Sequence, residues 1–229
     1  MIPPISIISA FFACLLLTGM PPASASQPPV ESRVFNLVVK MQAAFKEIED
    51  YTCEVEQIFY QEGEEDQRYR FKYYFKKEKR IRVDFYYPYP TLSFFYTGGE
   101  KEVTAVPFRP MALLKFRLSV DNPKIRTLTG QKIDQTDMAY FIEFLFENLK
   151  KVPQKDDEYK EDRDQVTFWF QALDFINGEK IERYRIVISK DYWLPIRIER
   201  YTLEKKPIEL SIIKNYTINT HLDGKLFVP

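Results

Sequence analysis

The chain contains little cysteine, histidine or glycine, and this narrows the chemistry that it can perform. Its 229 residues include two cysteines, one histidine and seven glycines. These are too few cysteines and histidines for an ordinary zinc site, and no Gly-x-Ser-x-Gly elbow precedes His221 to indicate a catalytic triad. The sequence also has no Gly-rich phosphate loop. We therefore expect a protein that is not an enzyme and that needs no cofactor or metal.

The chain also lacks an excess of charge of either sign, since it has 33 basic and 33 acidic residues. A neutral balance argues against nucleic acid or an anionic membrane surface as the main partner. The basic run from Lys76 to Arg80 is typical of a solvated hairpin turn rather than a phosphate site. No pair of carboxylates stands out, so a glycosidase-like acid pair stays an open alternative without named residues.

The apolar stretch at the start of the chain has the form of a signal peptide. Ile5 to Met20 is about as long as a signal core, and Ala23-Ser24-Ala25 supplies a cleavage motif. Because the stretch is short for a bilayer span, we expect cleavage after Ala25 and export to the periplasm, with an uncleaved anchor as the alternative. Residues 26–229 then form one domain without an internal disulfide, because Cys53 is the only cysteine left.

Between Asp50 and Phe108 aromatic residues recur at every second position, with charges between them. A period of two predicts half-solvated antiparallel strands with one wide apolar face. Such a face has to be covered, closed or filled by a ligand. Apolar spacing also predicts a helix over about 32–48. The expected strands lie near 51–60, 68–77, 80–87, 92–97, 101–106, 165–173, 181–189, 193–203, 208–218 and 225–228.

Two further segments change to a helical period, and one is almost wholly charged. Met111 to Leu118 and Asp137 to Lys150 are predicted to be helices inserted between two halves of a sheet. The charged stretch from Pro153 to Asp164 is predicted to be an exposed loop or a strand-breaking linker.

Three segments carry a resemblance to a known family. Asp50 to Gln57, placed after a first helix, resembles the opening strand of the LolA family of periplasmic lipoprotein carriers. Tyr73 to Pro88 is similar to the family's strand, turn, strand and closing proline. Leu194-Pro195, Asn219 and the end Leu226-Phe227-Val228-Pro229 resemble its final strands.

The resemblance implies a mainly β fold, an incomplete antiparallel β-barrel of about eleven strands with an N-terminal helix and inserted lid helices at about 109–150. It further implies a monomeric carrier whose cavity takes the acyl chains of a lipoprotein or another lipid cargo. In that family the cargo comes from an inner-membrane transporter and passes to an outer-membrane acceptor. An envelope sensor that binds lipid and a membrane partner, and a structural envelope protein without ligand, are the alternatives.

The pattern and the resemblance together name a set of ligand-binding side chains. They are Val55, Phe71, Tyr73, Phe75, Ile81, Val83 and Phe85 on the strands, and Leu114, Phe141 and Leu145 on the lid helices. Lys77-Glu78 stands where the family turn has Arg-Pro, so Lys77 is expected to contact the lid with a different donor geometry.

Overall fold

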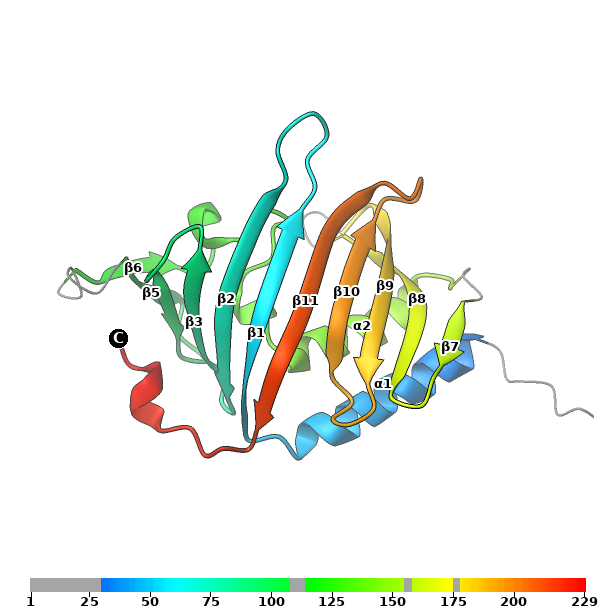
Figure 1. Cartoon of the computed structure of the whole chain (residues 1–229), viewed down its shortest axis with the longest axis horizontal. Coiled ribbons are helices and arrows are strands. Elements are labelled where there is room, and N and C mark those ends of the chain that lie inside the picture. Colours follow the sequence, from blue (N-terminus) through cyan, green and yellow to red (C-terminus); the bar gives the residue numbers. More distant parts are fainter. Residues whose placement is uncertain (1–29, 108–113, 155–157, 175–177) are drawn as a thin grey trace, which may run out of the picture.

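The architecture is a single open sheet of eleven antiparallel strands with helices on one face (Figure 1). The computed structural model describes residues 30–107, 114–154, 158–174 and 178–229. The strand order is β6-β5-β4-β3-β2-β1-β11-β10-β9-β8-β7. Strands β6 and β7 are the two edges, so the sheet does not close. The predicted fold class, an incomplete antiparallel barrel of about eleven strands, is confirmed.

The elements follow one another along the chain in two groups of strands separated by helical segments. They are α1 (Val30–Lys46), β1 (Asp50–Phe59), β2 (Gln67–Lys76), β3 (Arg80–Tyr87), β4 (Ser93–Tyr96), β5 (Glu102–Val106), β6 (Phe116–Ser119), the 3-10 turns η2 (Pro123–Ile125) and η3 (Ile133–Gln135), α2 (Met138–Lys151), β7 (Tyr159–Glu161), β8 (Gln165–Leu173), β9 (Ile181–Ser189), β10 (Pro195–Tyr201), β11 (Pro207–Ile218) and the 3-10 turn η4 (Gly224–Phe227). Because β1 pairs with β11, the first and last strands lie together at the centre of the sheet.

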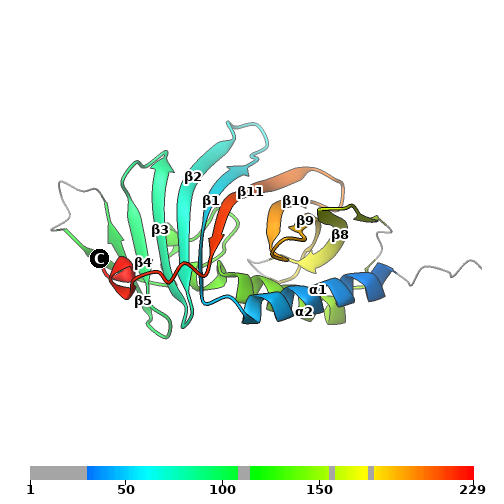
Figure 2. The ribbon, with the colours of Figure 1, turned by 60° about the horizontal axis from the view of Figure 1, so that its bottom comes forward.

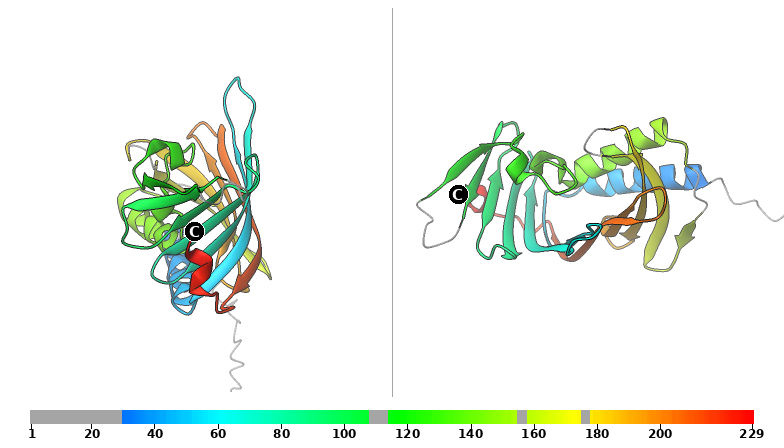
Figure 3. Two further views of the ribbon diagram at one scale, coloured as in Figure 1. Left: turned by 90° about the vertical axis from the view of Figure 1, so that its left-hand side faces the viewer. Right: turned by 90° about the horizontal axis from the view of Figure 1, so that it is seen from above.

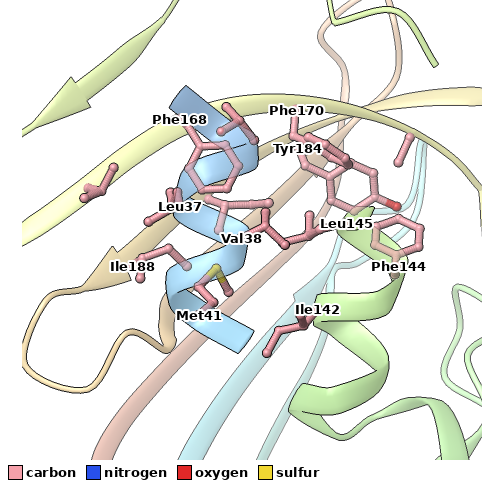
Figure 4. Packing of buried hydrophobic residues seen from close by; sticks show 14 residues of the cluster. Leu37, Val38, Met41, Ile142, Phe144, Leu145, Phe168, Phe170, Tyr184 and Ile188 are labelled. Carbon is pink, nitrogen blue, oxygen red and sulfur yellow. The ribbon is translucent and has the colours of Figure 1, made fainter. Parts of the chain in front are cut away.

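The two α-helices lie side by side across one half of the sheet (Figures 2 and 3). In α1 the buried residues Val34, Leu37, Val38 and Met41 recur at spacings of three and four, which places them on one stripe. They pack with Ile142 and other residues of α2 and with the inward side chains of β8 and β9 (Figure 4). We call this cluster the helix-covered core.

The other half of the sheet carries its apolar residues in rows that cross the strands. The register aligns Tyr51, Phe75 and Ile81 in one row across β1, β2 and β3. The next two rows are Cys53, Tyr73 and Val83, and then Val55, Phe71 and Phe85. A segment over residues 123–141, comprising η2, η3 and the first turn of α2, contributes residues to the cavity that these strands line. We call it the lid segment.

Three sequence-based assignments are wrong. Within the part of residues 111–118 that the structure describes, Phe116–Ser119 is strand β6 instead of helix, because it finds backbone partners in β5. The charged stretch contains a strand, β7, which pairs with β8; short charged strands are typical of sheet edges. The predicted strand at 225–228 is the 3-10 turn η4, which Asp223 caps by accepting a hydrogen bond from the Lys225 amide.

The predicted cleavage site after Ala25 lies outside the described residues. Among the residues that are described, no helix is both long and apolar enough to span a bilayer.

Candidate ligand-binding site

A cavity of about 450 Å³ lies between the strands β1, β2, β3 and β11 and the lid segment. This volume falls in the range of about 300–1,000 Å³ that is usual for small-molecule sites. Protein interiors are normally packed to the density of organic crystals, with few voids larger than a water molecule. The cavity is therefore a built feature of this half of the sheet, and the helix-covered core beside it shows that the same chain packs its interior elsewhere.

The walls of the cavity are largely aromatic. The rings of Phe71 and Phe85 lie 5.3 Å apart between centroids, and Phe85 and Phe94 lie 5.8 Å apart in an edge-to-face arrangement. Tyr69 meets Phe85 at 6.4 Å. These side chains remain half-buried although they point to the inner face, because no protein side chain covers them completely. Such a surface suits an apolar chain.

The cavity is closed at one end and open at the other. Tyr51 and Tyr73 are 0% and 5% exposed, and they mark what we call the closed end. Tyr89 and Leu128, by contrast, line the cavity and are 55% and 45% exposed, so they mark the mouth.

A buried ion cluster lies where β10 and β11 meet the cavity. Arg200 Nη1 is 2.9 Å from Glu209 Oε2, and Arg200 Nη2 is 2.7 Å from Glu182 Oε2. Burial acts to lower the pKa of Arg200, but the neighbouring Tyr184, Glu209 and Glu182 outweigh it and hold that pKa above its usual value. The guanidinium is therefore permanently charged.

Three further side chains complete the hydrogen bonding of Glu209. Ser211 donates to Oε1 at 2.9 Å and Gln57 donates to the same atom at 3.3 Å. Thr129 of the lid segment donates to Oε2 at 3.2 Å. Both carboxylate oxygens of Glu209 accept hydrogen bonds. Glu209 is therefore a structural part of the cavity wall and is not available as a general acid or base.

The lid segment is attached to the sheet by few polar contacts near the closed end. Lys79 Nζ donates to the Asp134 carbonyl at 3.4 Å and lies 3.8 Å from Asp137 Oδ2. Tyr73 and Thr136 join their hydroxyls at 3.2 Å. Asp137 also caps α2, since its Oδ1 accepts from the Tyr140 amide at 2.9 Å. Burial raises the pKa of the Asp137 carboxyl.

The structure brings part of the predicted ligand-binding set together. Val55, Phe71, Tyr73, Val83, Phe85 and Phe141 all line the cavity. Their contact with a ligand stays a prediction, because only their position is given by the structure.

Four residues of the predicted set lie elsewhere. Phe75 and Ile81 are 3% and 0% exposed and belong to the packed core next to the closed end. Leu145 is fully buried in the helix-covered core, because it lies past the first turn of α2, where that helix packs on β8 and α1. Leu114 is 48% exposed and does not line the cavity, since no helix forms at this described position.

The lysine that reaches the lid segment is not the predicted one. Lys77 Nζ donates to the carbonyl of Lys46, the last residue of α1, at 2.9 Å and to Glu49 in the connection between α1 and β1. Lys79 contacts the lid segment instead. Glu78 and Lys79 adopt φ values of 70° and 55°, so the chain turns sharply between the two lysines and they reach different elements.

Sequence reasoning missed the ion cluster and the residues of the lid segment before α2. The alternation of the strands contained a signal for the cluster. Arg200 stands two positions after Ile198, so the two side chains share one face of β10. Glu209 stands two positions before Ser211 and four before Ile213, so it shares their face of β11. Charged residues on the inward face of alternating strands are uncommon unless paired. The segment 123–136 carries no periodicity that would place it over the sheet.

Within the described ranges, no three His, Cys, Asp or Glu side chains are grouped to hold a metal ion.

Comparisons with known proteins give similar architectures at low identity. No family profile matches the sequence, and neither does any curated protein. A LolA superfamily protein from Nitrosomonas europaea is 10% identical, with 86% of this chain and 97% of that chain covered and a TM-score of 0.41. A DUF1329 family protein from Desulfovibrio piger is 13% identical, with 87% and 98% covered and a TM-score of 0.43. MucB is 8% identical, with 88% and 64% covered and a TM-score of 0.48.

The LolA superfamily, which the sequence motifs resemble, is thus also among the structures to which this chain is similar. Identities of 13% or less and TM-scores below 0.5 leave the ligand to be argued from the cavity itself.

Proposed function

We propose that the protein is a periplasmic carrier that binds the acyl chains of a lipoprotein, or another apolar lipid cargo, in the cavity beneath the lid segment. The carrier takes its cargo from an inner-membrane transporter and gives it to an outer-membrane acceptor. Its work is binding and transfer rather than catalysis.

The observation that carries this proposal is the unfilled apolar volume of about 450 Å³. An apolar ligand group gains about 0.8 kcal/mol for each methylene that it moves out of water, so a chain of several methylenes repays the cost of entry. The half-buried rings of Phe71, Phe85 and Phe94 gain from the same burial. A cavity of this size destabilises a protein that binds no ligand, because the side chains that line it lose van der Waals contacts. A purely structural role does not explain it.

We expect the lid segment to move away from the sheet when cargo enters or leaves the cavity. Its polar attachment near the closed end consists of the Lys79 and Tyr73 contacts described above, and Lys79 has a side chain that is 45% exposed. Asp137 at the other end of this pair is 0% exposed, but the two groups are 3.8 Å apart and the lysine is solvated, so the pair is a weak attachment. Elements of low local stability are the ones that move in ligand entry.

The proposal is tested by loading and transfer. Purified protein is mixed with a fluorescent triacylated peptide, with the same peptide without acyl chains as the control, and the complex is isolated by size exclusion. The expected result is a one-to-one complex with the acylated peptide alone, which loses its cargo to vesicles made from outer-membrane extract. Absence of a complex contradicts lipid binding, and a complex that never releases cargo favours the sensor alternative.

Export is part of the same proposal, because a carrier between two membranes has to reach the periplasm. We expect the mature protein to begin at Ser26 and to fractionate as soluble periplasmic material. N-terminal sequencing that returns Met1 would contradict this localisation.

A further inference from the structure

The hydroxyl of Tyr51 is buried at the closed end of the cavity without a hydrogen-bond partner among the residues that the structure describes. The side chain is 0% exposed, so bulk water does not reach it. Buried polar groups in folded proteins are nearly always hydrogen-bonded, and an exception needs an explanation. The position of Tyr51 on the wall of a ligand-sized cavity offers one, namely a partner supplied by the ligand.

The neighbouring hydroxyls are engaged, which leaves the Tyr51 proton for the cavity. Thr136 donates its only hydroxyl proton to the Ile133 carbonyl at 2.7 Å, so in the 3.2 Å contact between Tyr73 and Thr136 the tyrosine is the donor. Tyr216, whose ring lies 6.0 Å from that of Tyr51, donates to the Pro195 carbonyl at 2.9 Å. Of these three tyrosines, Tyr51 alone has a hydroxyl without a hydrogen-bond partner among the residues that the structure describes.

We propose that the closed end of the cavity is a polar subsite in which the Tyr51 hydroxyl donates a hydrogen bond to an uncharged oxygen of the ligand. The preferred cargo therefore carries a hydroxyl, ester or keto oxygen on an apolar chain. This inference rests on the proposed function, and it adds the chemical class of the cargo to it.

The surroundings favour an uncharged oxygen over a carboxylate. Burial raises the pKa of Tyr51 well above its usual value, so the phenol keeps its proton and acts as a donor. Asp137 Oδ2 is buried nearby without a hydrogen bond among the described residues, and the cation paired with it is Lys79 at 3.8 Å. A second carboxylate here would be desolvated and would face that oxygen. A hydroxyl has the further advantage that it can accept from Tyr51 and donate to the oxygen of Tyr73.

The test compares fatty acids that differ by one oxygen atom. Stearate and a panel of monohydroxystearates, with the hydroxyl at successive carbons, are titrated calorimetrically into the full mature protein and into Tyr51→Phe. The matched control is Tyr216→Phe, which removes a neighbouring buried hydroxyl from outside the cavity lining. In the unaltered protein, at least one hydroxystearate is expected to bind about 3–10-fold more tightly than stearate, the size of one neutral hydrogen bond.

Tyr51→Phe is expected to abolish this preference, so that the variant binds every hydroxystearate no more tightly than stearate. Its Tm is expected to stay unchanged or to rise, because the substitution breaks no protein hydrogen bond among the described residues. Tyr216→Phe is expected to lower the Tm and to keep the preference. Equal affinity for all chains in the unaltered protein, or a preference that survives Tyr51→Phe, would overturn the subsite while leaving lipid binding intact. A lower Tm of Tyr51→Phe with unchanged selectivity would also overturn it. Failure of every chain to bind would instead remove the proposed function, and the subsite with it.

Discussion

Arg200 and Glu209 face each other across the β10–β11 pair, with 2.9 Å between Nη1 and Oε2 and side chains that are 4% and 9% exposed. The pair forms part of the cavity wall, and through Thr129 it also ties the lid segment to the sheet. A buried ion pair of this kind adds little net stability by itself, but its loss is costly because the remaining charges stay buried and uncompensated.

Replacing Arg200 with Met should therefore lower the free energy of unfolding by about 3–5 kcal/mol, since Glu182 and Glu209 are left without their cation. The measurement is urea unfolding at neutral pH. The control is Arg185→Met, which removes a 39%-exposed arginine from the pair with Glu199 and should cost about 1 kcal/mol or less. Similar losses in both variants would show that the Arg200 cluster is not buried as described.

The Asp137 carboxyl should make stability depend on pH. Burial raises its pKa in the folded state, so the protonated form stabilises the fold at pH values below the unfolded pKa, and this contribution is lost as pH rises through the folded pKa. Asp137→Asn keeps an oxygen to cap α2. We expect the variant to be at least as stable as the unaltered protein at pH 7 and to lose this advantage in acid.

The control for this titration is Asp121→Asn, which should change stability in the opposite direction. A hydrogen bond from Lys132 lowers the pKa of Asp121, so its ionised form favours the folded state and the variant should be the less stable one at pH 7. Unfolding curves collected between pH 3 and pH 7 would contradict the assignment if Asp137→Asn were destabilised most at pH 7.

Filling the cavity should block binding without unfolding the protein. Val55 lies half-buried on the wall, so Val55→Trp places a large ring in empty space, whereas enlargement in a packed core costs about 1–3 kcal/mol. We expect at least a tenfold loss of affinity for an acyl probe with little change in Tm. Glu56→Trp, one position along β1 and on the outer face, is the control and should bind normally. Equal affinity in the two variants would place the ligand elsewhere.

Amide hydrogen exchange should separate the lid segment from the sheet. Residues 123–136 contain only short 3-10 turns, whereas β2 is hydrogen-bonded on both sides within the sheet. We expect faster exchange in 123–136 than in β2, and slowing mainly in 123–136 when stearate is bound. Most of α2 should stay protected because it belongs to the helix-covered core. Equal protection of both regions, with and without stearate, would argue against a moving lid.

The sequence predicted the elements whose pattern is local. The period of two in Arg68–Lys76 places Tyr73 and Phe75 on the inner face, and the structure agrees. The edge strands β6 and β7 were not predicted, because three or four residues are too few to show a periodicity. They are strands because they pair with β5 and β8.

The site could be predicted less well, because it depends on contacts between distant segments. Tyr73 and Phe75 belong to the same alternating face, yet Tyr73 lines the cavity and Phe75 does not. Phe75 lies against Phe45 of α1, with 5.7 Å between the ring centroids, whereas Tyr73 contacts Thr136 of the lid segment. The partnership of Arg200 with Glu209 likewise follows from the register of β10 on β11, which no local pattern fixes.

Native mass spectrometry of the protein isolated from the periplasm can show whether a lipid or lipoprotein occupies the cavity. We expect a bound species of lipid or lipoprotein mass at one copy per chain, retained by Glu56→Trp and absent from Val55→Trp. A protein that is uniformly ligand-free, although gently isolated from cells that make its cargo, would contradict carriage. The same species on both variants would show that the cavity beneath the lid segment is not where the cargo binds.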